Sequence, residues 1–254
     1  MSFEEALPIL LLATYLTMLG VERWRPARAF PEVKGWRWLG LGFLLVLFML
    51  NGLIPELLPL KWIQDHALLP GWKLGIAGGA VAGFLAVTLV DYAFHRAYHR
   101  IPALWRAVHQ LHHSAGRVDI YGSAYAHPTE IVLMVLQGVF VLVLVLGLDP
   151  TAGAIAGYAA AFCAMFTHWN IHTPRWLGCF IQRPEAHCLH HERRVHAWNY
   201  SNLPLWDMLF GTWRNPAAFR GAVGFDDGRG EQVLAILKGR DVHADKSTLP
   251  YLPV

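Results

Sequence analysis

The most distinctive feature of this 254-residue sequence is its histidines, because ten of the fourteen fall into four regularly spaced clusters. Two clusters hold a pair four residues apart, and two hold three histidines at positions i, i+3 and i+4. Residues three and four apart lie on one face of a helix, so each cluster is predicted to present its imidazoles together. The ten are His95, His99, His109, His112, His113, His168, His172, His187, His190 and His191.

Imidazoles at this spacing predict metal binding. A closed zinc site needs about four ligands, so ten histidines indicate two metal ions that share them. Imidazole suits iron, zinc, copper and nickel alike, so the residue type leaves the metal open. Cys188, inside the last cluster, is interpreted either as a thiolate ligand or as a small buried side chain beside the site.

Other polar residues near the clusters are candidates for holding a ligand ring by its second nitrogen, a common arrangement around protein-bound metals. Asp91 lies one turn before His95 on the same predicted helix face, although an ordinary polar residue at a membrane boundary would also fit there. The other candidates are His127, Glu130, Glu185, His196 and Asp207. His196 is equally well interpreted as a surface residue.

The composition predicts a membrane protein. Hydrophobic residues make up 55% of the chain and charged residues only 15%, and the mean hydropathy is positive. The formal net charge is +3 with scattered basic residues, which argues against nucleic-acid binding. The three cysteines show no CxxC spacing, which argues against a zinc finger and a disulfide framework.

Apolar segments predict an all-α, polytopic integral membrane protein with four to five transmembrane helices. The segments are residues 6–20, 38–58, 74–94, 131–148 and 151–167. The first and last are shorter than the about 20 residues that a spanning helix needs, so four spans plus an interfacial helix is an alternative. We expect one domain, with N-terminal transmembrane helices in residues 1–70, a histidine-rich catalytic core in 71–216 and a cytoplasmic tail in 217–254.

Basic residues predict the orientation in the membrane. They gather in the connection after the first segment and in the segment after the third, whereas the opposite connections hold few. By the positive-inside rule the N-terminus lies outside and the basic connections are cytoplasmic. All four histidine clusters then meet at the cytoplasmic face, where they form a histidine-rich helical cap.

Small residues predict which spans pack together. Glycines at four-residue spacing in the third segment form a smooth ridge that permits close helix contact in lipid, and the fifth segment is also rich in small residues. The glycines concerned are Gly71, Gly75, Gly79 and Gly83 in the third, and Gly153 and Gly157 in the fifth. We expect these two helices to pack because both carry histidine clusters to one centre.

The spacing and flanking motifs resemble the membrane fatty acid hydroxylase and sterol desaturase superfamily over about residues 91–216. Its three histidine boxes are matched by the clusters that begin at His95, His109 and His187, and the pair His168 and His172 fits its ten-histidine pattern. Residues 127–130 (HPTE) resemble its HPxE element, and residues 206–212 (WDMLFGT) resemble its WDxLFGT signature. Asn199 and Tyr200 match its NYG element, with serine at residue 201 where glycine is usual.

The resemblance implies a non-haem di-iron centre, with two Fe ions and O2 as co-substrate, that hydroxylates or desaturates a C–H bond of a membrane lipid such as a fatty acyl chain, a sterol or an isoprenoid. The sequence shows no haem-attachment, ferredoxin-like or dinucleotide-binding motif. Electrons are therefore expected from a separate protein of the ferredoxin, cytochrome b5 or reductase type.

A membrane metal transporter, or a metal-binding protein without redox catalysis, is the alternative. Transport would need polar or ionisable residues along the spans. Asp91 is the one clear acid within a predicted span, and the histidines gather at one end of the spans. The sequence therefore favours the oxidative enzyme.

Overall fold

Every regular element is helical within residues 3–226 and 228–242, the part of the chain that the computed structural model describes. Within that part, five helical segments are long and apolar enough to cross a membrane. They are α1 (Phe3–Trp24), α2 (Trp36–Glu56), α4 (Gly75–Arg100), α7 (Pro128–Gly138) with its continuation η4 (Val139–Val145), and α8 (Pro150–His168). This confirms the all-α fold with five candidate membrane spans.

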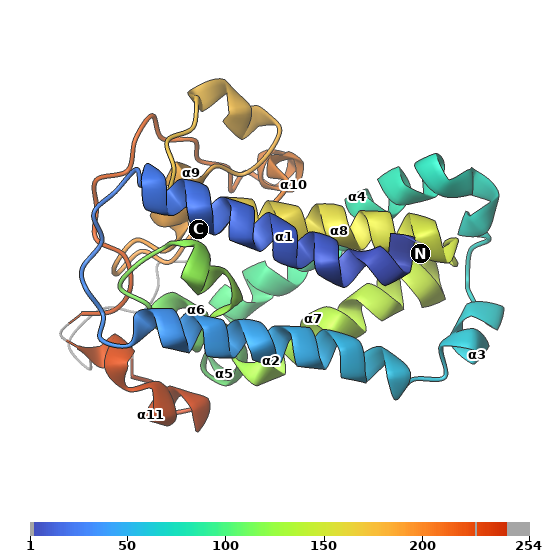
Figure 1. Ribbon diagram of the computed structural model, residues 1–254, viewed down its shortest axis with the longest axis horizontal. Helices are drawn as coiled ribbons and strands as arrows, with labels where there is room; N and C mark the ends of the chain where they lie inside the picture. The colour runs from blue at the N-terminus through green and yellow to red at the C-terminus, as the bar shows by residue number, and fades with distance from the viewer. Residues whose placement is uncertain (1–2, 227, 243–254) are drawn as a thin grey trace.

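Short helices cover one end of this bundle (Figure 1). They include α5 (Pro102–Leu104), η2 (Trp105–His109), α6 (Gln110–Ser114), η3 (Ile120–Ala124), α9 (Pro184–His190) and α11 (Val233–Leu237). The remaining short helices of the described residues are α3 (Leu60–Asp65), η1 (Gly71–Leu74), η5 (Arg175–Cys179), α10 (Pro204–Leu209) and η6 (Arg229–Glu231), of which α3 lies at the opposite end. The end covered by α6 and α9 carries the histidines, so the predicted histidine-rich cap is present.

The packing of α4 against α8 depends on small residues, as predicted. A Cβ atom on Gly79 would lie 2.9 Å from that of Ala152, and one on Gly83 would lie 2.9 Å from that of Ala156. The two backbones therefore approach too closely for larger side chains. Gly153 and Gly157 have open space around them, so alanines provide the contact on α8.

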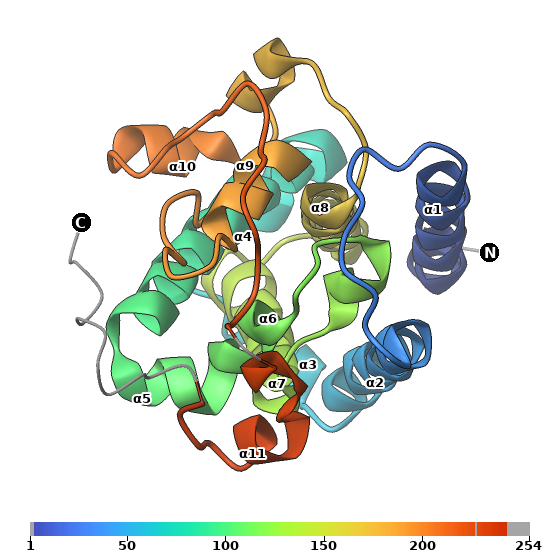
Figure 2. The ribbon, with the colours of Figure 1, turned by 90° about the vertical axis from the view of Figure 1, so that its left-hand side faces the viewer.

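Buried polar contacts join the first spans to the cap. The Glu22 carboxylate near the end of α1 accepts hydrogen bonds from the main-chain N–H groups of Ile120 and Asn170, at 3.0 and 2.8 Å. The Trp36 indole at the start of α2 donates to Asp119 at 2.9 Å. Figure 2 shows α1 and α2 side by side at one edge of the bundle, and these contacts fix their ends to the cap.

One hydrophobic core cluster runs from the first helix to the C-terminal part of the chain. It contains Tyr15 of α1, Leu111 of α6, Phe166 of α8 and Ile236 of α11, all buried. The region predicted as a tail therefore packs on the cap as far as it is described. Residues 227 and 243–254 of that tail lie outside the described residues.

Candidate metal centre

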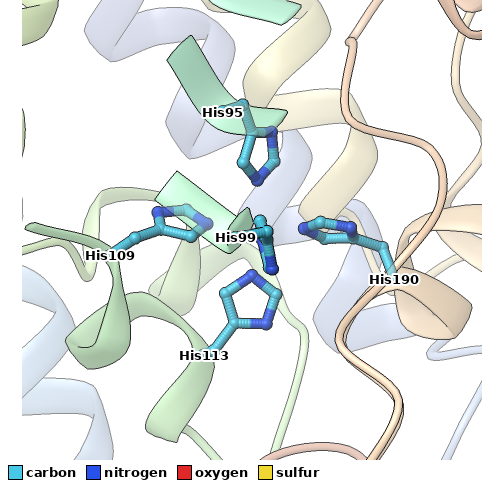
Figure 3. A group of neighbouring side chains, drawn as sticks. All are labelled: His95, His99, His109, His113 and His190. Carbon is cyan, nitrogen blue, oxygen red and sulfur yellow. The ribbon is translucent and has the colours of Figure 1, made fainter. Parts of the chain in front are cut away.

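Nine of the ten clustered histidines come together in two neighbouring groups. Within each group, one ring nitrogen from every residue lies within 4.8 Å of the others. The five-histidine group consists of His95, His99, His109, His113 and His190, which Figure 3 shows converging on one point. The four-histidine group consists of His112, His168, His187 and His191. The four distant parts of the chain thus meet at a shared centre, as the spacing predicted.

In each of the two three-histidine clusters, the residues at i and i+4 belong to one group and the residue at i+3 belongs to the other. His109 and His113 belong to the five-histidine group, whereas His112 belongs to the four-histidine group. The last cluster is arranged in the opposite sense, because His187 and His191 belong to the four-histidine group and His190 belongs to the five-histidine group. Successive residues on a helix point about 100° apart, so one short helix can reach two adjacent sites.

His172 lies outside both groups and is exposed. Helix α8 ends at His168, and the next residue, Trp169, has an extended backbone. The four-residue spacing therefore no longer places the two rings on one helix face. His168 alone contributes from this part of the chain.

Main-chain carbonyls fix the tautomers of several rings. The Nδ1 atom of His95 lies 2.6 Å from the Tyr200 carbonyl oxygen, that of His190 lies 2.7 Å from the Trp198 oxygen, and that of His112 lies 3.0 Å from the Tyr125 oxygen. A carbonyl only accepts, so each Nδ1 carries the proton and donates. The lone pair of each ring is then on Nε2, which is directed into the centre.

Side chains hold two further rings. The Nδ1 atom of His109 donates to Glu130 Oε1 at 2.7 Å, and that of His187 donates to Gln182 Oε1 at 3.0 Å. These contacts place Glu130 where the sequence predicted it, whereas the sequence did not single out Gln182. Its one sequence signal is its position five residues before the last cluster.

His196 also contacts a ring of the five-histidine group. Its Nδ1 atom lies 2.9 Å from Nδ1 of His113, so one of the two rings donates to the other. Its side chain is almost completely buried. The structure therefore supports the prediction that His196 holds a ligand ring rather than the surface interpretation.

The other predicted polar residues lie further from the rings. Asp91 pairs with the Asn202 amide at 3.5 Å, and His127 accepts from the Thr129 N–H at the start of α7. Asp207 accepts from the main-chain N–H groups of residues 200 and 201, both at 2.8 Å. It thus holds the loop whose carbonyl contacts His95. Cys188 is buried in a small apolar cluster, in agreement with the interpretation as a buried side chain.

The nitrogen atoms of the two groups fit metal ions. Among the described residues, Nε2 of all five rings in the five-histidine group is buried without a hydrogen-bond partner, which is costly for a polar atom unless it binds something. In the four-histidine group, Nε2 of His187 lies 3.1 Å from Nε2 of both His168 and His191. Nitrogens bound to one ion at about 2.1 Å would be separated by about 3.0–3.4 Å.

Burial also keeps the cap histidines neutral, which metal binding requires. Desolvation lowers the pKa of His109 and of His112 to about 3. Desolvation likewise lowers the pKa of His187 and of His190 well below the usual histidine value. Neutral imidazoles are therefore available as ligands at physiological pH.

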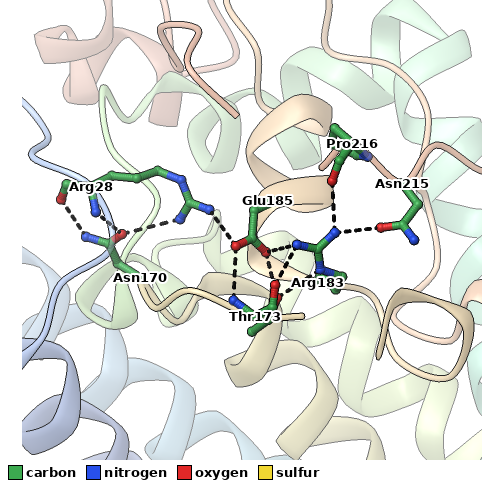
Figure 4. Close-up of polar contacts among 7 residues, drawn as sticks. All are labelled: Arg28, Asn170, Thr173, Arg183, Glu185, Asn215 and Pro216. Carbon is green, nitrogen blue, oxygen red and sulfur yellow. Dashed lines mark hydrogen bonds and ion pairs between the residues drawn. The ribbon is translucent and has the colours of Figure 1, made fainter. Parts of the chain in front are cut away.

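A buried ion-pair network positions α9, which carries the last histidine cluster (Figure 4). Glu185 pairs with Arg183 at 3.2 Å and with Arg28 at 3.4 Å, and it accepts from the Thr173 hydroxyl at 2.7 Å. Arg183 also donates to the Asn215 side chain at 2.8 Å. The charges compensate one another inside the protein, so the start of α9 is fixed between three separate loops.

The loop after α9 has an unusual backbone. Four of its residues, Arg194, His196, Trp198 and Asn199, have positive φ angles between 42° and 70°, and they are the only non-glycine residues with positive φ in the described part of the chain. Such strain is found mainly where surrounding structure and function require it. Here the loop directs the carbonyl oxygens of residues 198 and 200 towards rings of the five-histidine group.

Comparison with known proteins shows a family match that covers these histidines. The fatty acid hydroxylase family profile matches residues 80–212. The chain is 31% identical over 140 residues to the ornithine lipid hydroxylase OlsE of Rhizobium tropici, an alignment that covers 54% of this chain and 42% of the relative. It is 25% identical over 144 residues to sphinganine C4-monooxygenase 1 of Arabidopsis thaliana, covering 55% of each chain.

A third relative is the alkylglycerol monooxygenase of Danio rerio, which is 31% identical over 138 residues, with 51% of this chain and 29% of the relative covered. The chain thus aligns with about half or less of the length of these relatives. No solved structure matches.

Proposed function

We propose that this chain, which belongs to the fatty acid hydroxylase family, is an integral membrane oxidoreductase that uses O2 and two bound iron ions to hydroxylate or desaturate a C–H bond of a membrane lipid. The proposal rests on the two neighbouring groups of imidazoles, one of five histidines and one of four. In each group the ring nitrogens converge. The names of the relatives, which are lipid hydroxylases and monooxygenases, support a lipid as substrate.

Iron ions bound by the two groups would transfer electrons to O2. The protein contributes by holding the rings. The carbonyls of Trp198 and Tyr200 keep the His190 and His95 rings in the tautomer that leaves Nε2 free. The Glu130 carboxylate on His109 makes that ring a more basic ligand.

The position of the centre suits a lipid substrate. The histidines lie at the ends of α4 and α8, two helices that are long and apolar enough to cross a membrane. A hydrocarbon chain dissolved in the bilayer can approach this end of the bundle without passing through water. The short helices of the cap cover the centre from the other side, which excludes water from the reacting bond.

The proposal includes a donor and an orientation. Hydroxylation of one C–H bond by O2 puts one oxygen atom into the lipid and releases the other as water, which consumes two protons from solvent and two electrons. A separate ferredoxin, cytochrome b5 or reductase-type protein would supply the electrons. The metal centre faces the cytoplasm and the N-terminus lies outside, because basic residues are concentrated between α1 and α2 and at the end of α4.

A combined metal and lipid measurement tests the proposal. We expect about two iron ions per purified chain, and lipids of expressing cells that gain one oxygen or lose two hydrogens by mass. His190→Ala should abolish the lipid product, and His172→Ala, outside both groups, should retain it. A metal-free protein, or lipid profiles identical between wild type and His190→Ala, would refute the assignment.

A further inference from the structure

Helix α10 and the residues before it lie beside α4 rather than beyond its end. The Trp206 indole donates to the Thr88 hydroxyl at 3.0 Å. The Ser201 hydroxyl, on a short side chain, donates to the Thr88 carbonyl at 3.4 Å. Thr88 belongs to the long helix α4 and is buried. In Figure 1, α10 is drawn within the length of the spanning helices, and Figure 2 shows it at the periphery of the bundle.

These contacts fix the depth of α10 in the membrane. The predicted span in α4 continues to Phe94 with Asp91 as its one acid, and the polar residues His95, Arg96 and Arg100 follow. Thr88 precedes Phe94 by six residues, which is about 9 Å along a helix. Ser201 and Trp206, which contact Thr88, therefore lie at a level that belongs to the hydrocarbon layer when α4 spans the bilayer, and Phe210 stacks on Tyr92, two residues before Phe94.

The outward surface of this segment is apolar. Leu205, Leu209 and Phe210 are 40%, 65% and 51% exposed, whereas Asp207 on the inner side is completely buried. The exposed rings of Trp176, in η5, and Phe180, directly after it, lie nearby. The Trp213 indole donates to the Gly178 carbonyl of η5 and so joins the two segments. Facing water, so large an apolar surface would be unfavourable.

A non-spanning segment in lipid needs partners within the protein for its backbone polar groups, and several N–H groups of this segment have them. The N–H groups of residues 200 and 201 donate to the Asp207 carboxylate. The N–H of residue 203 donates to the Ser201 hydroxyl, and those of residues 212 and 213 donate to the Asp207 carbonyl. Pro204 has no N–H group to satisfy.

Aromatic rings connect this surface to the candidate metal centre. The Phe210 ring stacks on Tyr92 with centroids 5.1 Å apart, and Tyr92 meets Tyr200 edge-on at 6.2 Å. The Tyr200 ring in turn lies 5.3 Å from the His99 ring and 5.7 Å from the His190 ring. The lipid-facing edge of α10 is thus two aromatic side chains away from the five-histidine group.

We propose that α10 is a re-entrant segment embedded in the hydrocarbon layer beside α4, and that its outward face binds acyl chains of the leaflet on the metal side. Phe210 marks the side from which the acyl part of a lipid reaches the five-histidine group. This last statement rests on the proposed function, whereas the embedding of α10 does not.

Spin labels in lipid nanodiscs test the embedding. Leu209→Cys and Leu205→Cys place labels on the α10 surface, and Ala222→Cys places one on an exposed turn over the cap, all in a Cys179→Ser background with zinc as the metal. We expect the α10 labels to be relaxed several-fold more by O2 than by a water-soluble nickel complex, and the Ala222 label to show the reverse. Equal accessibility to the nickel complex at all three positions would overturn the embedding.

Lipid turnover tests the entry side. Phe210→Arg should reduce lipid oxidation several-fold without loss of metal, and Leu234→Arg, at an exposed position on α11, should not. Unchanged turnover in a metal-loaded Phe210→Arg protein would overturn entry at Phe210. If the wild type itself oxidises no lipid, the proposed function fails while the spin-label result stands.

Discussion

His190 donates its Nδ1 proton to the main-chain carbonyl of Trp198, 2.7 Å away, and Trp198 has a left-handed backbone with a φ angle of 70°. A ring that is proposed to bind metal is thus oriented by a peptide group in a conformation that most residues avoid. The orientation of the carbonyl, rather than the identity of the side chain, is what the ring requires.

The difference between His168 and His172 can be measured directly. His168→Ala removes a nitrogen from the four-histidine group and should lower bound iron from about two ions to about one per chain. His172→Ala removes an exposed ring outside both groups and should leave the metal content unchanged. Elemental analysis of the purified variants decides between them, and loss of metal from the His172 variant would contradict the proposed ligand set.

Gln182 should act on the metal through His187. Gln182→Leu removes the acceptor that fixes the His187 tautomer, and loss of such a partner typically lowers metal affinity by about 10–100-fold. Titration with a competing chelator should show weakening of one of the two bound ions. The matched control is Gln64→Leu, which removes an amide contact to the Leu148 carbonyl at the opposite end of the bundle; similar affinities in both variants would exclude a role for Gln182.

Replacement of Glu130 should lower metal affinity more than replacement of His127, which lies in the same HPTE motif. Glu130→Leu leaves the His109 Nδ1–H group buried without its acceptor, and metal affinity should fall by roughly 10–100-fold. Glu130→Gln should lose less, because its amide oxygen can still accept the proton. His127→Ala removes the N-cap of α7 and a contact to the Leu237 carbonyl at 3.3 Å, and losing the cap costs about 1 kcal/mol in stability. A loss of metal affinity equal to that of Glu130→Leu would argue against the ring contact.

Arg183 should be important for stability. Its side chain is 1% exposed and pairs with a Glu185 side chain that is 3% exposed. Arg183→Met leaves a buried carboxylate with weaker compensation, and breaking such a pair typically costs about 3–5 kcal/mol. Lys61→Met, which breaks the exposed pair with Asp65, should cost less than about 1 kcal/mol. Thermal unfolding in detergent compares the two, and equal midpoints would show that the network contributes little.

The contact between α4 and α8 predicts opposite effects for two glycines. An added Cβ on Gly83 would lie 2.7–3.0 Å from side-chain atoms of Leu142, Leu148 and Ala156, so Gly83→Ala should destabilise the protein by about 1–3 kcal/mol. Gly157 has open space around it, so Gly157→Ala should be neutral or stabilising by up to about 1 kcal/mol. Unfolding midpoints that shift in the same direction would show that the packing is looser than described.

The sequence predicts much of the centre because histidine spacing and apolar length are local properties. Spacings of three and four residues bring His109, His112 and His113 to one side of a short helical stretch, and apolar runs identify the five spans. The division of the second and third boxes between two groups was not predicted, because it depends on where one helix lies relative to the others. His172 shows the same limit, since its placement depends on where α8 ends.

Partners that act through the backbone leave no signal in the sequence. Tyr200 and Trp198 contact rings through their carbonyl oxygens, and every residue has such an oxygen. The side-chain partners were easier to identify: Glu130 and His196 were predicted from their positions near the boxes. Gln182 was missed because an amide before a box has no characteristic spacing.

The alternation of the boxes has a mechanical consequence. His112 and His113 are joined by one peptide unit and serve different groups, and so are His190 and His191. Consecutive Cα atoms are separated by a fixed 3.8 Å, so the covalent chain limits the distance between the two groups at these positions. The separation of two ions bound at these groups would therefore be limited at two places by a single peptide unit.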